Sequence, residues 1–334
     1  MRGSFTEAIE EIPARARTTG RLRRAIGAAV GEACRSVAEV AVAHGVSWPT
    51  AHAAFVEYAE ALLASPEPTA VLGIDETRRG KPRWRFSIED KRWVRVDPYD
   101  TGFVDLAGDQ GLLGQREGRT SKTVLDWLTE QTPEFRDAIR FVAIDPAAVY
   151  AAAVRARGED GELLLPHARL VVDHFHVVKL ANDCVTKVRR RVIWEQKGRR
   201  GRKLDPAWAN RRRLLRAKES LSDKGFAAMW NSLIDSDPSG QILAAWIAKE
   251  ELRTLLALAR TGASRGVIAT QLFVFYDWCA STTIEELHTL ATTVETWWPE
   301  IEAFIDTGIT NERASHCTFC RGSDAAGAVG PLAA

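Results

Sequence analysis

Two short apolar runs that each end in an aspartate constrain the fold of this chain more than any other feature. Residues 70–74 are followed by Asp75, and residues 139–144 by Asp145. Runs of this length, bounded by turn residues, are typical of strands buried on both faces of a sheet. A carboxylate directly after such a strand lies at the edge of the sheet. On neighbouring strands, two of them can share divalent metal ions, as a phosphoryl-transfer site requires.

Length and composition predict a globular protein of two or three domains. The chain has 334 residues, of which 46% are hydrophobic and 27% charged, with a net charge of +1. Three of its five cysteines are isolated in the sequence, which indicates no disulfide framework and favours a reducing cytoplasm. No apolar run reaches about 18 residues, so we expect no membrane partner, and the N-terminus lacks a secretory signal.

Residues 1–65 are expected to form a helix-turn-helix region. Within them a short apolar helix meets Gly45, which can turn the chain at positive φ. Ser47 can then cap a second helix that has Pro49 in its first turn, and the small Ala41 lies where the two helices would touch. A plain helical hairpin is the alternative. Residues 65–69 have the composition of a linker.

Residues 70–180 are predicted to form an α/β core. After the first strand, further strands are expected at residues 83–88, 91–96, 101–106, 139–144 and 170–172, with helices at 121–128 and from residue 150. Three meandering strands, helix, strand, helix, strand is the order of a ribonuclease H-like mixed sheet. In that order the first and fourth strands are neighbours. Asp75 and Asp145 are therefore expected to lie together.

Residues 181–300 are predicted to be mostly helical, with a strongly basic segment between Lys187 and Lys218. A solvated helical face would explain such a segment, but arginines with almost no acids between them favour contact with a phosphate backbone. The arginines expected to bind DNA are Arg189, Arg190, Arg191, Arg211, Arg212 and Arg213.

Four motifs in order resemble those of one known family. Residues 73–76, 143–145, 172–180 and 307–311 are similar to the motif series of DDE transposases of the ISL-three type, which are proteins of bacterial insertion sequences. The resemblance extends from about residue 20 to residue 315. It implies a ribonuclease H-like catalytic core, a large helical insertion before a final catalytic helix that starts within residues 301–315, and a helix-turn-helix domain upstream.

The resemblance also implies a set of catalytic acids. Asp75 and Asp145 correspond to the first two, which would bind Mg²⁺ or Mn²⁺, with Asp75 bridging two ions. The third acid of the family is a glutamate a few residues after Thr310 and Asn311, and its position falls on Ser315 or His316, neither of which is acidic.

Residues 316–334 do not resemble the family and are expected to be an aberrant, disordered tail. The family usually carries a cysteine-rich zinc module before the helix-turn-helix, so both ends of this chain are expected to be truncated. His316, Cys317 and Cys320 imitate half of a zinc site, but no second cysteine pair accompanies them, and we predict no zinc there.

Other acids and histidines near these positions are further candidates for the site. Glu76 is expected to point to the opposite face from Asp75. Asp173 ends the last strand and could reach the site. His174 and His176 are expected to pack and form hydrogen bonds rather than bind metal, and Glu312 could replace the missing acid only after a shift of about one helical turn.

The sequence therefore predicts a transposase that cleaves and joins double-stranded DNA at element ends and at a target, impaired by loss of the third acid. Thr50 and His52, at the start of the predicted recognition helix, are expected to determine sequence preference. A homo-oligomer is possible in such a reaction. The alternatives are a catalytically dead DNA-binding remnant and a product that barely folds.

Overall fold

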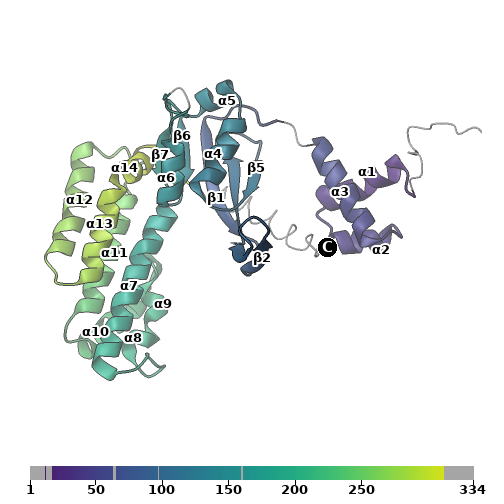
Figure 1. Cartoon of the computed structure of the whole chain (residues 1–334). Coiled ribbons are helices and arrows are strands. Elements are labelled where there is room, and N and C mark those ends of the chain that lie inside the picture. Colours follow the sequence, from purple (N-terminus) through teal and green to yellow (C-terminus); the bar gives the residue numbers. More distant parts are fainter. Residues whose placement is uncertain (1–11, 13–16, 63–64, 97, 159–160, 312–334) are drawn as a thin grey trace, which may run out of the picture. The chain divides into compact units, whose positions relative to one another are not determined.

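The computed structural model describes residue 12 and residues 17–62, 65–96, 98–158 and 161–311. The chain divides into two compact units (Figure 1). Of the described residues, one unit contains residues 12, 17–62, 65–67, 77–96 and 98, and the other contains residues 68–76, 99–158 and 161–311.

The N-terminal segment folds into three helices, α1 (Gly20–Gly31), α2 (Val37–Ala43) and α3 (Trp48–Leu62). The Ser36 side chain caps α2 by accepting a hydrogen bond from the Glu39 N–H. Gly45 turns the chain at φ 64° before α3, a conformation that glycine adopts at little cost. Ala41 is buried at the contact between the helices. This is the helix-turn-helix arrangement expected from the sequence.

Two strands outside the main sheet form a hairpin. β2 (Arg83–Ser87) pairs antiparallel with β3 (Arg92–Val96) as a separate two-stranded sheet. The sequence analysis placed these strands in the meander of the main sheet, and that placement was wrong. Because both strands carry arginines and these lie on both faces of the hairpin, neither face is suited to burial in a core, and most of the side chains are exposed.

The main sheet has the strand order β5-β4-β1-β6-β7. Its members are β1 (Val71–Arg78), β4 (Tyr99–Asp105), β5 (Leu112–Glu117), β6 (Phe141–Ile144) and β7 (Arg169–Val172). β4 and β5 are antiparallel, whereas β1, β6 and β7 run parallel. The fold is a ribonuclease H-like mixed sheet with a helical insertion, and β1 and β6 are neighbours, as predicted. β1 does not end at Asp75, as the sequence suggested, but continues to Arg78.

One face of this sheet packs against helices α4 (Ser121–Glu130), α5 (Pro133–Ala138) and α6 (Ala148–Val154). Trp127 of α4 stacks on Phe103 of β4 with ring centroids 3.9 Å apart. Leu72 and Ile74 of β1 are fully buried in the same core. Because side chains alternate along a strand, Gly73 and Asp75 point to the opposite face.

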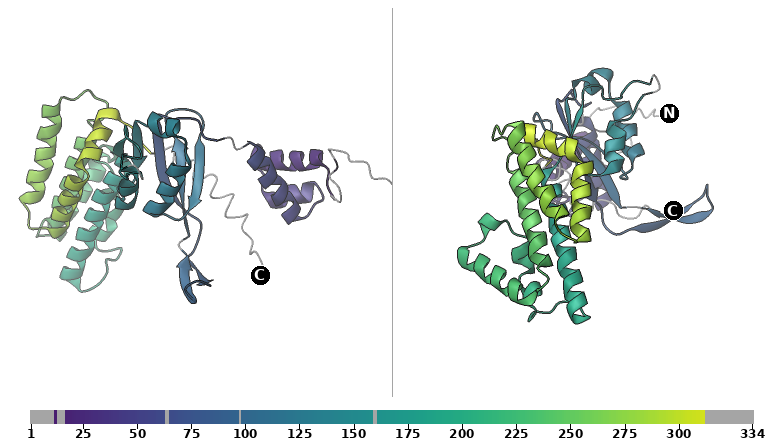
Figure 2. Two further views of the ribbon diagram at one scale, coloured as in Figure 1. Left: turned by 45° about the horizontal axis from the view of Figure 1, so that its top comes forward. Right: turned by 90° about the vertical axis from the view of Figure 1, so that its left-hand side faces the viewer.

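The rest of the second unit is helical (Figure 2). Its elements are α7 (His174–Lys197), α8 (Pro206–Ala209), α9 (Arg211–Leu214), η1 (Lys218–Ser220), α10 (Asp223–Ser236), α11 (Gln241–Leu256), α12 (Arg265–Ala280), α13 (Glu285–Thr296) and α14 (Trp298–Thr307). Helices α11 and α13 pack against α7, and α14 packs against β7. The helical core therefore continues into the sheet through Val171 and Val172 of β7. Among the described helices, none is both long and apolar enough to cross a membrane.

Candidate active site and nucleic-acid interface

Three aspartates stand in a row, each directly after a paired residue of a parallel strand. β6 and β7 end just before Asp145 and Asp173, whereas β1 continues through Asp75 to Arg78. Ile74 of β1 pairs with Ile144 of β6, which pairs with Val172 of β7. The next residue on each strand is Asp75, Asp145 or Asp173. Register partners on parallel strands point to the same face, and neighbouring strands are roughly 4.8 Å apart. The sheet therefore brings together three acids that are distant in sequence.

A histidine from the first turn of α7 joins two of these acids. His176 Nε2 lies 2.8 Å from Asp145 Oδ2, and His176 Nδ1 lies 3.6 Å from Asp173 Oδ2. Asp173 also caps α7 by accepting from the Phe175 N–H and lies 3.3 Å from His174 Nδ1. His174 stacks on Phe304 of α14. Both oxygens of Asp173 thus face groups of α7, which assigns this acid a structural role beside the site.

The charges around Asp173 and His176 shift the ionisation of these two groups. Burial opposes the ionisation of Asp173, but the close imidazoles of His174 and His176 and a hydrogen bond from the Phe175 N–H hold the pKa of its carboxyl well below its usual range. Burial also opposes a charged imidazole at His176, yet its contact with Asp145 and the nearby carboxylate of Asp173 raise its pKa to about 9. An imidazolium between two carboxylates offsets the repulsion that would otherwise separate them.

Asp75 and Glu76 point to opposite faces of β1, as expected. Asp75 is buried, and its Oδ1 accepts from the Glu76 N–H at 2.8 Å. Glu76 forms an ion pair with Arg119 at 3.3 Å and accepts a long hydrogen bond from the Tyr150 hydroxyl. Burial, together with the charges of Glu76, Asp75 and Asp145, raises the pKa of Tyr150. Tyr150 therefore stays neutral beside the acids.

The segment after α14 returns to the strand that carries Asp75. Asn311 is fully buried, and its Nδ2 donates to the Ile74 carbonyl at 3.0 Å. Its Oδ1 is buried without a partner and would lie 2.7 Å from a Cβ at Gly73. Gly73 thus makes room for Asn311. The Thr310–Asn311 motif is bound to β1 one residue before Asp75.

The chemistry of the donors fits a divalent metal. Asp145 Oδ1 is buried with no hydrogen-bond partner among the described residues, and Asp75 offers a second carboxylate on the neighbouring strand. Oxygen anions are the ligands that Mg²⁺ and Mn²⁺ prefer. Over the described residues, however, no three His, Cys, Asp or Glu side chains form a group able to hold a metal. Glu312, Ser315, His316, Cys317 and Cys320 lie outside those residues.

The three arginines predicted on α7 differ in their surroundings. Arg189 is buried, and burial and the charges of Arg190 and Arg211 lower its pKa. Arg191 forms an ion pair with Glu286 at 2.7 Å and also contacts Glu195. Of these three arginines, Arg190 alone is exposed. Arg189 and Arg191 are thus placed to hold the helical core together.

The arginines of α9 are more accessible. Arg211 lies over the ring of Trp208, with 3.5 Å between its Cζ and the ring centroid. Arg212 and Arg213 are exposed, and Arg213 donates to Asn210 Oδ1 at 2.9 Å. The exposed members of the six arginines predicted to contact DNA are therefore Arg190, Arg212 and Arg213.

Thr50 and His52 lie in the first turns of α3. The Thr50 hydroxyl is 2.8 Å from Ser47 Oγ, and the Thr50 N–H also points to that oxygen. The His52 ring stacks on Trp48 with centroids 4.9 Å apart. Both side chains are partly exposed, so the start of α3 presents a hydroxyl and an imidazole in a fixed geometry.

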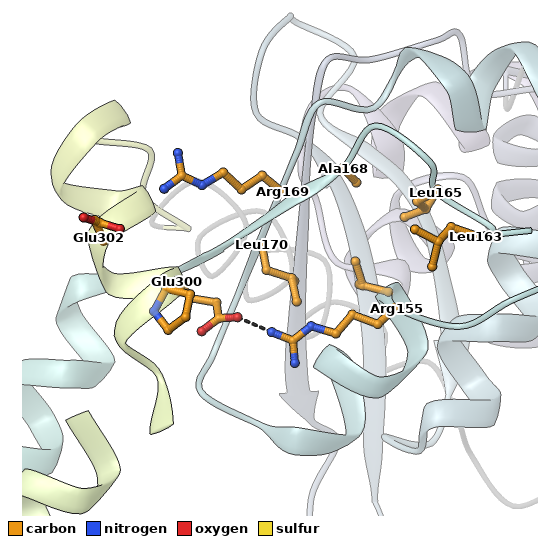
Figure 3. Close-up of a pocket in the computed structure, with 10 residues that line it drawn as sticks. Arg155, Leu163, Leu165, Ala168, Arg169, Leu170, Glu300 and Glu302 are labelled. Atoms are coloured by element: carbon orange, nitrogen blue, oxygen red, sulfur yellow. Dashed lines mark hydrogen bonds and ion pairs between the residues drawn. The ribbon is translucent and has the colours of Figure 1, made fainter. Parts of the chain in front are cut away.

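A cavity of about 300 Å³ lies elsewhere in the second unit (Figure 3). It is lined by Arg155, Leu165, Arg169 and Leu170 and by the start of α14, where Glu300 pairs with Arg155. Arg169 and Leu170 begin β7, whereas Asp173 follows its end. The cavity is therefore at the other end of the strand from the row of aspartates.

Two contacts of the site have little signal in the sequence. His176 follows Asp173 by three positions, a helical spacing that suggests contact between them, but its contact with Asp145 depends on the pairing of β6 and β7. The bond from Asn311 to Ile74 joins residues 237 positions apart. Only the tertiary fold reveals either contact.

Comparisons with known proteins agree with the motifs and the fold. A family model described as a transposase, the DDE type of ISL3, matches residues 72–314. The chain belongs to this family. A second model, the helix-turn-helix domain of transposase family ISL3, matches residues 7–59.

Two other comparisons, with curated proteins and with solved structures, do not extend the assignment of this chain to the ISL3 transposase family. No curated protein matches its sequence. A solved structure titled Drosophila P element transposase strand transfer complex is similar with a TM-score of 0.41 and 9% sequence identity, over 90% of this chain and 84% of that chain.

Proposed function

We propose that this ISL3 transposase binds double-stranded DNA through α3 and the exposed arginines Arg190, Arg212 and Arg213. We further propose that Asp75 and Asp145 form the metal-binding part of its cleavage site. The observation that carries the proposal is the pairing of Ile74 on β1 with Ile144 on β6, because Asp75 and Asp145 are the residues that directly follow this pair. Their side chains point to the same face, and Asp145 Oδ1 is buried without a protein partner.

The protein's own residues prepare this site in three ways. The Glu76 N–H fixes one oxygen of Asp75. His176 fixes Asp145 Oδ2 and leaves Oδ1 to face a ligand. Asp173 holds His176 and the start of α7. A divalent metal bound by the two carboxylates would supply the positive charge that activates a nucleophile and stabilises a leaving oxygen during strand cleavage and transfer.

We propose that this activity is impaired because a third carboxylate is missing. The sequence after Asn311 carries Ser315 and His316 where the family resemblance implies a glutamate. A hydroxyl or a neutral imidazole does not match the charge of a carboxylate at Mg²⁺. The supporting observation is that Asn311, the last described residue, donates to the Ile74 carbonyl, which lies one residue before Asp75 on β1.

Two assays test the proposal. Duplex DNA carrying the ends of the element should bind the protein, and Thr50→Ala or His52→Ala should change the preferred sequence rather than abolish binding. With Mg²⁺ or Mn²⁺, the protein should nick this DNA no faster than Asp75→Ala. Nicking by the unaltered chain that disappears in Asp75→Ala would show that another acid completes the site and would overturn the proposed impairment.

A further inference from the structure

The hairpin of β2 and β3 carries a concentration of exposed aromatic side chains. Trp84 and Trp93 are 64% and 65% exposed, and Phe86 is 47% exposed. Burying such side chains is normally favourable, so three exposed on one short hairpin indicate a binding surface.

The strand register sorts these side chains by face. Trp84 pairs with Arg95 and Phe86 pairs with Trp93, so these four residues share one face, which we call the aromatic face. Phe86 and Trp93 contact each other edge to face, with ring centroids 5.8 Å apart. This contact with Phe86 orients the Trp93 ring, while most of the Trp93 side chain stays exposed to solvent.

The opposite face of the hairpin is basic. Arg83, Arg85 and Arg92 lie on it together with Val94 and Val96. Arg92 is 4.0 Å from Asp90, whereas the side chains of Arg83 and Arg85 have no ion pair or hydrogen bond with any described residue. Between residues 77 and 98 the sequence holds eight basic and three acidic residues. The charge of the hairpin therefore complements a polyanion.

We propose that this hairpin binds unpaired DNA bases by stacking them on the aromatic face, while its arginines contact the backbone phosphates. Rings interleaved with arginines are the combination that holds single strands with little sequence preference. A duplex hides the faces of its bases within the stack, so the rings cannot reach them there. The occupant that fits is DNA with unpaired bases, such as the ends exposed by cleavage.

The position of the hairpin in the chain suits this role. Trp84 follows Asp75 by nine positions, and an extended chain of that length spans at most about 32 Å. This is about one turn of duplex DNA. The inference rests on the proposed function, since it names a second DNA contact for the same protein.

The test compares binding of two labelled probes, a 20-nucleotide oligothymidine and a 20-base-pair duplex, by fluorescence anisotropy. The test variant carries Trp84→Thr and Trp93→Thr, because threonine keeps the strand propensity and removes the rings. A second variant carries Trp84→Phe and Trp93→Phe. The matched control is Phe273→Ala on α12, where the side chain is 67% exposed and lies outside the hairpin.

The threonine variant should bind oligothymidine at least about 10-fold more weakly, because each stacked base contributes about that much affinity. The phenylalanine variant and the Phe273→Ala control should bind it nearly as well as the unaltered protein. Duplex binding should stay unchanged in all of them. Oligonucleotides containing 5-iodouracil should photocrosslink to the peptide that contains Trp84 or Trp93.

Unchanged oligothymidine affinity in the threonine variant, or crosslinks confined to other segments, would overturn the proposal. Light scattering addresses the rival occupant, a second copy of the chain: a dimer that becomes a monomer in the threonine variant would also overturn it. Unchanged duplex affinity and unchanged sequence preference in Thr50→Ala and His52→Ala, with oligothymidine binding that the threonine variant still weakens, would instead count against the proposed function alone.

Discussion

The contact between Gly73 and Asn311 gives the sharpest prediction about how the C-terminal segment is bound to the sheet. A Cβ at position 73 would lie 2.7 Å from Asn311 Oδ1 and 2.9 Å from Leu106 Cδ1. Both distances are shorter than van der Waals contact, so Gly73→Ala must displace these side chains. Overpacking of this kind costs about 1–3 kcal/mol. Displacing Asn311 also breaks its bond to the Ile74 carbonyl, and an unpaired buried carbonyl costs a further ~1–3 kcal/mol.

Urea unfolding of Gly73→Ala, Asn311→Ala and the double variant measures this coupling. If Asn311 is the main obstacle, the double variant should be more stable than the sum of the single effects predicts, by about 1 kcal/mol or more. Gly266→Ala serves as the control, since its added Cβ would meet only Ser264 Oγ at 3.8 Å in an exposed helix. That change should be neutral or slightly stabilising. Strict additivity of the two single effects would refute the proposed contact.

Three further predictions concern the helical insertion. Lys249 is fully buried and its Nζ donates to the Leu214 and Arg216 carbonyls, so Lys249→Met should lower the free energy of unfolding by about 3 kcal/mol or more in urea titrations. Arg212→Ala with Arg213→Ala should weaken duplex binding for all sequences and reduce the salt slope by about 0.9 for each lost phosphate contact; an unchanged slope would remove α9 from the interface. Hydrogen bonds from Arg199, Lys197 and the Arg202 N–H lower the pKa of Asp205 in the folded state. The ionised carboxylate therefore stabilises the folded state above about pH 4, and this stabilisation is lost as the pH falls further. Asp205→Asn should make the melting temperature depend less on pH in that range.

The sequence predicted the parts of the fold that depend on local patterns. The apolar runs before Asp75 and Asp145 identified β1 and β6, and Gly45 with Ser47 identified the turn between α2 and α3. The position of β5 was missed, because only Leu112 and Leu113 mark it as apolar. Its Gly114 fits against Trp127, a contact that exists only after the sheet has folded.

The hairpin shows why alternation alone misled the assignment of strands. Residues 83–87 and 92–96 form strands, but arginines lie on both faces of the hairpin, with Arg95 on the aromatic face and Arg83, Arg85 and Arg92 on the other. Alternation predicts a strand and does not say which partner it joins. The candidate site was predictable in its two acids, whereas the contact of His176 with Asp145 depends on the packing of α7 at the end of β7.

Metal binding by the two carboxylates tests the central claim most directly. Mn²⁺ binding to the unaltered protein, followed by electron paramagnetic resonance, should show a site that Asp75→Asn and Asp145→Asn each weaken at least about 10-fold. Asp126→Asn on α4, an exposed carboxylate that pairs with Lys122, is the control and should leave the affinity unchanged. Equal Mn²⁺ affinity in all four proteins would contradict the assignment of Asp75 and Asp145 as the metal-binding pair.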